Sequence, residues 1–433
     1  MLLVYSYKIT PRLKYTFNLY FKDLLGIDYK LTTSRQDFIT SELPKISYSE
    51  LPLKDEIHFQ SRTMLFETGI LDQNIAVSDY LGSKIFFMVG NESVLPFDVF
   101  AAGFYLVSRY EEYLPHIRDA YDRFEAKDSL AFQNNFLQTP IVNTWAQWIK
   151  QILKNKYPSV IFKEPTYKFI STIDIDNAYA YKEKGLARTL GGYAKSIIDF
   201  NTKALKDRTR VLLRLQADPY DTFQYQLEFH KRKKVTTIYF FLLGTYGLND
   251  KNLSPDNKKF QSLIKNIADY AQVGIHPSFG SNKDKEQLKS EINILSKILH
   301  REITQSRQHF LKLTLPETYR NLIDFDITDD YTMGYASQVG FRASICTPFY
   351  FYDLDSESET KLRIHPFAMM EGTLKYYMNI DSENAMSYIK PLIDNIKAVN
   401  GTFISLWHND TLSDLGIWKG WRSIYEEMVD YAQ

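Results

Sequence analysis

From residue 169 to residue 408 the sequence alternates short apolar runs with longer amphipathic stretches. The apolar runs are rich in β-branched and aromatic residues, as buried strands are, and the clearest are 169–176, 235–244, 272–276 and 401–408. The amphipathic stretches between them have helical spacing and include 221–233, 284–300 and 382–399. Strands that alternate with helices form parallel βα units, so we expect an α/β protein with a mostly parallel sheet.

Polar side chains follow several of these predicted strands at the point where each strand ends. Asp174 and Asp176 close the first run, His276 closes the third, and His408 closes the last. Arg307, with His309 two residues later, follows another short strand candidate. Because the carboxyl ends of parallel strands meet at one edge, these side chains are expected to share one site at the mouth of a barrel.

The two carboxylates at the end of the first run indicate the chemistry of this site. Asp174 and Asp176 lie two positions apart, so in an extended chain both point to one face, where they repel each other. A divalent cation or a shared proton relieves this repulsion, and one carboxylate can then bind metal while the other acts as a base. The alternative is a strand that ends in an ordinary Asp/Asn turn. The residues downstream favour the site.

The length of the chain, 433 residues, predicts two domains. The polar, turn-prone segment 154–158 places their boundary near residue 160. We expect a smaller α/β domain at 1–160 and the barrel at 161–433. In the first, residues 96–113 are predicted to form a helix. Its Arg109, Glu111 and Glu112 either have a functional role or, as we expect, form local ion pairs at a solvated helix end. Residues 340–345 of the second are predicted to form a strand.

Lysine and arginine balance aspartate and glutamate, at 52 each, so the overall charge favours neither nucleic acid nor an anionic membrane as a partner. No apolar run is long enough to span a bilayer, and the first residues lack the features of a signal peptide. The single cysteine, Cys346, fits a reducing compartment. The sequence therefore predicts a cytoplasmic protein, and it leaves the oligomeric state open.

The segment 169–408 resembles the polysaccharide deacetylases, carbohydrate esterase family 4, through the order and spacing of its motifs. Thr172-Ile173-Asp174-Ile175-Asp176 is similar to the first family motif, and Leu406-Trp407-His408 is similar to the fifth. His276 and Arg307 match the first histidine of the second motif and the arginine of the third. The resemblance implies a distorted (β/α) barrel, with Asp174 as general base, Arg307 orienting it and His408 as general acid. It further implies Asp176 and His276 as ligands of a divalent metal, zinc first. The N-terminal unit resembles a domain of unknown function that precedes such barrels in some bacterial proteins.

The second motif departs from the family at Gly280, where a second metal-binding histidine is expected. Asn282, Ser281 or His309 could supply the third ligand that catalytic zinc usually has. Otherwise the site works without metal through Asp174 and His408, or the barrel is inactive. A site that is one ligand short would bind zinc more tightly after Gly280→His.

The function expected from this resemblance is removal of an acyl group, most simply N-acetyl, from an amino sugar or surface-glycan precursor. Two alternatives stay open: a non-catalytic carbohydrate-binding or scaffold protein, and a hydrolase of another non-peptide carbon–nitrogen bond. Individual residues also have structural explanations. His276 could be a hydrogen-bonded core histidine and Arg307 an ordinary ion-pair partner of Asp174, while His365 and Glu371 either line the mouth or belong to a turn.

Overall fold

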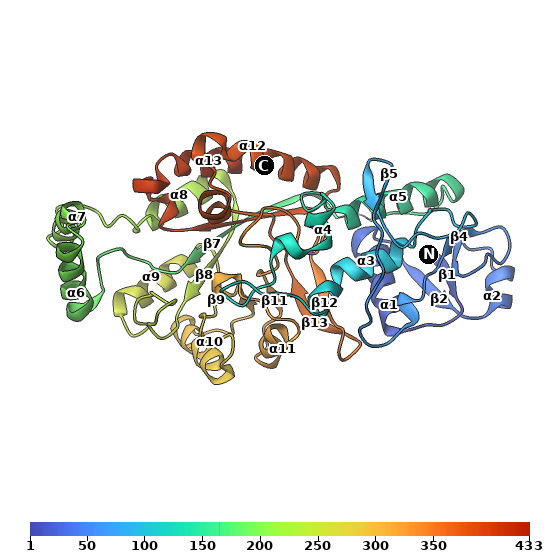
Figure 1. Ribbon diagram of the computed structural model, residues 1–433, viewed down its shortest axis with the longest axis horizontal. Helices are drawn as coiled ribbons and strands as arrows, with labels where there is room; N and C mark the ends of the chain where they lie inside the picture. The colour runs from blue at the N-terminus through green and yellow to red at the C-terminus, as the bar shows by residue number, and fades with distance from the viewer. Residues whose placement is uncertain (164) are drawn as a thin grey trace.

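The computed structural model describes residues 1–163 and 165–433. It is an elongated molecule in which a smaller N-terminal α/β unit lies at one end of a larger unit (Figure 1). A pair of helices projects from the larger unit at the opposite end (Figure 1). The expected fold class, a mostly parallel α/β sheet preceded by a smaller α/β unit, is confirmed.

The N-terminal unit is built on a parallel sheet whose order, in the described residues, is β2-β1-β3-β4. Its strands are β1 (Leu2–Ser6), β2 (Tyr29–Thr32), β3 (Lys45–Ser49) and β4 (Ile57–Gln60), and a separate hairpin is formed by β5 (Ser78–Tyr80) and β6 (Ser83–Ile85). The helices are α1 (Pro11–Phe17), α2 (Arg35–Thr40), α3 (Val99–Val107), α4 (Leu130–Gln133) and α5 (Ile141–Lys156), and a π-helical turn, Asn18–Leu24, continues α1. In place of the predicted helix 96–113 the structure has the shorter α3, because Arg109, just after its end, adopts a left-handed conformation with φ of 55°.

The larger unit holds a curved sheet of order β12-β13-β11-β10-β9-β8-β7-β15-β14 among the described residues. The strands are β7 (Lys168–Ile175), β8 (Thr236–Leu242), β9 (Gln272–His276), β10 (Gln305–Ser306), β11 (Asp329–Asp330), β12 (Phe349–Asp353), β13 (Ser358–Ile364), β14 (Met369–Met370) and β15 (Thr402–His408). Adjacent strands run parallel except for β12 and β13. The amide of Phe367, just before β14, donates to the Met333 carbonyl, just after β11, and so links the two sides of the curve.

Helices cover the outer face of this sheet. They are α8 (Phe223–Lys233), α9 (Lys258–Ala268), α10 (Lys285–Leu299), α11 (Glu317–Asp324), α12 (Ser382–Ala398) and α13 (Trp421–Ala432), and the projecting pair is α6 (Gly185–Ile198) and α7 (Thr202–Leu212). Inside the curve, alternate residues of the central strands form a small apolar cluster that includes Ile238, Phe240, Ile404 and Leu406. No helix in the described ranges is both long and apolar enough to cross a membrane.

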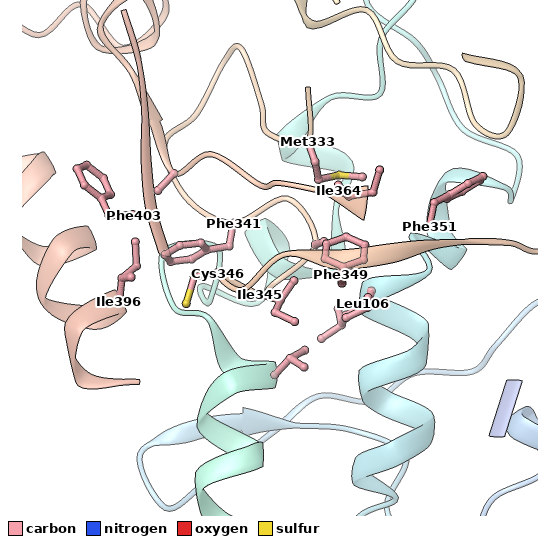
Figure 2. Close-up of a cluster of buried hydrophobic side chains, with 14 of the residues drawn as sticks. Leu106, Met333, Phe341, Ile345, Cys346, Phe349, Phe351, Ile364, Ile396 and Phe403 are labelled. Carbon is pink, nitrogen blue, oxygen red and sulfur yellow. The ribbon is translucent and has the colours of Figure 1, made fainter. Parts of the chain in front are cut away.

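The predicted strand 340–345 is wrong, because this segment is an irregular buried loop. Gly340 and Ser344 have positive φ values, which prevent an extended backbone. The loop bonds to the N-terminal unit instead of a strand: the Phe341 amide donates to the Leu137 carbonyl, and the Val142 amide donates to the Ser344 carbonyl. Figure 2 shows Phe341, Ile345 and Cys346 in a shared hydrophobic cluster with Leu106 of α3 and Phe349 of β12.

A buried ion network also joins the two units. Arg109 forms the expected local ion pairs with Glu111 and Glu112, but the expectation of a solvated helix end is wrong. Glu112 accepts from Arg109 Nε at 2.7 Å and from Arg342 Nη2 at 2.6 Å, and all three side chains are buried. Burial alone raises the pKa of Glu112, but Arg342 and Arg109 outweigh it and lower the pKa to about 2. Loss of one partner from such a network leaves a buried charge uncompensated.

A second buried polar group makes a testable contribution to stability. His230 of α8 lies between the hydroxyls of Tyr425 and Tyr239, and burial lowers its pKa from 6.5 to about 4. The folded protein holds this imidazole neutral, so its contribution to stability is complete above pH 6.5 and is lost as the pH falls toward 4. We expect a loss of about 3 kcal/mol across this window.

The measurement is urea unfolding at pH 7 and at pH 4.5 for the wild type and for His230→Gln. The variant should lose less stability on acidification than the wild type. The matched control is His300→Gln, at an exposed histidine, which should keep the wild-type dependence. Equal pH dependence in all three proteins would contradict the assignment.

Candidate active site

The sequence-predicted site residues come together at one end of the barrel. Asp174 closes β7 and lies level with His408 of β15, its register partner on the neighbouring strand. They border a cavity of about 330 Å³ whose wall also includes Asp176, His276 and His309. Aromatic side chains complete the wall, namely Phe310, Tyr376, Tyr377 and Trp418.

Asp174 is buried and is held by the arginine that the sequence pairs with it. Its Oδ1 accepts a hydrogen bond from Arg307 Nη1 at 3.0 Å. The same Nη1 donates to Thr172 Oγ1, and Arg307 Nε donates to the Tyr331 carbonyl at 3.0 Å. The guanidinium lies over the Phe240 ring, 4.9 Å from its centroid, at the top of the apolar cluster. Arg307 is therefore an ion-pair partner that fixes the position of Asp174, while Asp174 Oδ2 stays directed toward His276 Nε2 at 3.7 Å.

Three histidines direct one ring nitrogen toward Asp176, each with its other nitrogen held. His276 Nδ1 lies 2.6 Å from the Arg307 carbonyl, and because a carbonyl only accepts, Nδ1 carries the proton. His309 Nδ1 donates to Asp250 Oδ1 at 2.8 Å. His408 Nδ1 donates to Glu371 Oε1 at 2.7 Å. Acceptors of this kind orient the histidines of metal sites and leave Nε2 available as the ligand.

The Nε2 atoms of these histidines lie close to the Asp176 carboxylate. His276 Nε2 is 3.2 Å from Oδ1, while His309 Nε2 and His408 Nε2 are 3.3 Å and 3.9 Å from Oδ2. Asp176, His276 and His309 offer one ligand atom each, all within 4.8 Å of one another. These three residues could therefore hold a metal ion.

The local hydrogen bonding fits a cation at this position. Asp176 Oδ1 is buried and has no hydrogen-bond partner among the described residues. His276 Nε2 lies 3.2 Å from this oxygen, and a cation between the two atoms would give both of them a partner. One carboxylate and two imidazoles are also a common protein ligand set for catalytic zinc.

The charges around Asp176 also fit a cation at this position. Burial raises the pKa of Asp176, but the positive charges of His309 and His408 outweigh it and hold the pKa well below its usual value. For His309, burial lowers the pKa, whereas Asp176 and Asp250 raise it to about 9. A protonated His309 thus places a positive charge beside Asp176, and a metal ion that binds here must displace that proton.

His408 is positioned by Glu371, directly after β14. Glu371 Oε1 accepts from the His408 amide at 2.9 Å and from His408 Nδ1 at 2.7 Å. Burial lowers the pKa of His408, but the charge and hydrogen bond of Glu371, together with Asp176, raise it well above its usual value. His408 is thus protonated near neutral pH and directs Nε2 into the cavity.

Of the candidate third ligands, the structure brings His309 to the site. The Asn282 amide donates to the Lys312 carbonyl at 2.9 Å, and the Ser281 hydroxyl donates to the Ser278 carbonyl at 3.0 Å. Gly280 is not among the residues that line the cavity, and a side chain there would meet Gln287 of α10. His365 also lies apart, with Nε2 bound to Asp329 at 2.7 Å.

We accordingly expect Gly280→His not to strengthen zinc binding. With His309 in place the site already has three ligands, and a side chain at position 280 points toward α10. Calorimetric zinc titration should give one ion per chain for both proteins, with dissociation constants that agree within about threefold. A tenfold gain in the variant would show that the wild-type site is one ligand short.

Two carboxylates orient the histidines: sequence reasoning missed Asp250, and it left open whether Glu371 lines the mouth, as it does, or belongs to a turn. Asp250 lies in the loop after β8 and binds His309, and Glu371 binds His408. Glu371 follows the Met369–Met370 strand directly, so its strand-end position is a signal that the sequence does contain. Asp250 comes eight residues after the end of β8 and has no such signal.

Residues 2–158, which form the N-terminal unit, match the family model described as a family of unknown function (DUF7033). The search of curated proteins found no match.

Among solved structures, the chain is similar to a protein from Mycobacterium smegmatis assigned as a polysaccharide deacetylase. The identity is 12%, the TM-score is 0.39, and the match covers 61% of this chain and 84% of that one. The carbohydrate deacetylase Agd3 matches with 7% identity and a TM-score of 0.39, over 100% of this chain and 83% of its own. A family 4 pseudoenzyme from Bacillus anthracis, BA3943, matches with 11% identity and a TM-score of 0.29, over 62% of each chain.

These matches include the family that the motifs resemble. The three TM-scores are below 0.5, and the three proteins include a pseudoenzyme as well as proteins named as deacetylases.

Proposed function

We propose that the protein is a hydrolase that removes an acyl group, most simply acetyl, from the nitrogen of an amino sugar or surface-glycan precursor. One observation carries the proposal. Three imidazole Nε2 atoms converge on Asp176 in a cavity. The wall of this cavity also includes the Asp174 carboxylate, which Arg307 holds in place. This arrangement places a metal-binding set, a base and an acid around one space.

The metal would be held by Asp176, His276 and His309, with zinc the best fit to one carboxylate and two imidazoles. When bound, a divalent cation supplies a Lewis acid that polarises an acyl carbonyl and makes a water molecule more acidic.

Asp174 and His408 would carry the proton transfers. Asp174 Oδ1 is occupied by Arg307, so Oδ2 is the atom that accepts a proton from the attacking water. His408 is protonated, and because Glu371 holds Nδ1, Nε2 donates its proton to the leaving nitrogen. A bond forms between the water oxygen and the acyl carbon, the carbon–nitrogen bond breaks, and the products are a carboxylic acid and an amine.

The cavity wall favours a sugar as the carrier of the acyl group. Tyr376, Tyr377 and Trp418 line it, and flat aromatic rings offer the apolar faces of sugar rings a surface to stack on. A cavity of about 330 Å³ is suited to one acylated residue more than to a long polymer segment.

The test is acetate release from a panel of N-acetylated amino sugars, their oligomers and lipid-linked or nucleotide-linked forms, with zinc content measured on the same protein. We expect at least one substrate to release acetate, with activity lost on chelation and restored by zinc. Binding of these sugars without any acetate release would instead identify a non-catalytic binding protein.

A further inference from the structure

The helices α6 and α7 form a hairpin that projects from the barrel at the end opposite the N-terminal unit (Figure 1). The two helices contact each other through polar groups: Tyr193 Oη lies 2.9 Å from Thr209 Oγ1, and the Arg208 guanidinium lies over the Tyr193 ring. Across both helices, all of whose residues are described, Ser196 and Val211 are the buried side chains. The hairpin therefore has little core of its own.

Large apolar side chains of this hairpin are in solvent. Leu186, Leu190 and Ile197 follow one another on one face of α6, and Leu186 is 85% exposed. Ile198 and Phe200 follow at the turn, with Phe200 90% exposed. A helix of a soluble protein normally turns such a stripe toward its core, and a contiguous exposed apolar surface marks a binding site.

The same hairpin concentrates positive charge. Residues 185–215 contain seven lysines and arginines against two aspartates and no glutamate, although the whole chain is balanced. Lys203, Lys206 and Arg210 follow one face of α7, and Lys195 and Arg214 lie nearby in sequence. None of these five takes part in an ion pair within the described residues, so their charge remains available to a partner.

We propose that this hairpin binds the surface of an anionic lipid bilayer. Exposed leucine, isoleucine and phenylalanine side chains enter the boundary between headgroups and acyl chains, while lysine and arginine attract anionic headgroups. The exposed apolar residues of α6 and the turn match the apolar part of the bilayer, and the basic residues of α7 match its anionic headgroups. Aliphatic side chains add little to nucleic-acid binding, where aromatic stacking and polar contacts dominate.

The hairpin is connected to the site by the loop that follows β8. Arg188 of α6 donates to the Asn252 carbonyl at 2.9 Å and lies over the Tyr246 ring. The same loop carries Lys251, which lines the cavity, and Asp250, which holds His309. A membrane-bound hairpin would keep the cavity close to the lipid surface. This points to a lipid-linked glycan as substrate, an extension that rests on the proposed function, whereas the membrane contact does not.

The experiment is co-sedimentation of the full chain with two kinds of vesicle, one of phosphatidylcholine alone and one that also contains phosphatidylglycerol, at low and high salt. One triple variant removes apolar side chains: Ile197→Ser with Ile198→Ser and Phe200→Ser. The other removes positive charge from α7: Lys203→Gln with Lys206→Gln and Arg210→Gln. The matched control replaces exposed apolar residues elsewhere, Leu51→Ser with Ile117→Ser and Ile161→Ser.

We expect the wild type and the control to bind the anionic vesicles, and each hairpin variant to bind them at least about tenfold more weakly. Vesicle binding needs no turnover, so it is independent of the proposed activity, and acetate release from a soluble substrate should be unchanged in the hairpin variants. Absence of wild-type binding to anionic vesicles would overturn the proposal. So would a dimer, measured by light scattering, that the hairpin variants dissociate while vesicle binding persists.

Discussion

Replacement of Asp174 by asparagine is expected to lower kcat by roughly 10²–10⁴-fold, the usual contribution of a general base. The amide keeps an oxygen that can accept from Arg307 Nη1, so the position of the side chain is preserved. It cannot take a proton from water near neutral pH, so the chemical step is lost while substrate still binds. The measurement is kcat and KM for acetate release, with zinc content determined on the same preparations.

Loss of the negative charge also leaves Arg307 buried without its carboxylate, so stability must be measured beside activity. The matched control is Asp329→Asn, which removes the charge from another hydrogen-bonded aspartate, the partner of His365, away from the cavity. This control should keep wild-type kcat. If Asp174→Asn is folded, binds zinc and retains wild-type kcat, Asp174 is not the base.

The sequence predicted the parts of the site that lie on regular strands. Asp174, His276 and His408 are strand-end residues in the runs that carry the clearest β-forming pattern, and parallel topology brings such ends together. His309 was only one of three candidates because it lies beyond β10 in an irregular turn, where Phe310 has φ of 60°. Spacing from a strand end has no predictive value across such a turn.

The surface hairpin shows a different limit of sequence reasoning. The sequence of residues 181–200 suits either a helix or a loop, since Gly191 and Gly192 weaken a helix. The structure continues α6 through both glycines, and at Gly192 the Arg208 side chain lies where a Cβ would be. A balanced total charge also conceals a local excess, because it averages the basic hairpin over the acidic residues of the rest of the chain.

Replacement of His309 by alanine is expected to weaken zinc binding by at least about a hundredfold. Loss of a residue that only orients a metal ligand typically costs about 10–100-fold, and loss of the ligand itself should cost more. Because a protonated His309 also offsets the charge of Asp176, the variant brings Asp174 and Asp176 together with one cation fewer. Zinc titration by calorimetry, followed by acetate release at saturating zinc, measures both consequences.

The control for this variant is His365→Ala, since His365 is a similarly buried histidine bound to a carboxylate, Asp329, outside the cavity. It should leave zinc affinity unchanged. Asp250→Asn should give an intermediate loss, because His309 stays in place but its orienting carboxylate becomes neutral. This order of affinities separates a ligand from its support. Unchanged, stoichiometric zinc in His309→Ala would remove His309 from the metal site, and turnover by a zinc-free protein would favour a reaction carried by Asp174 and His408 alone.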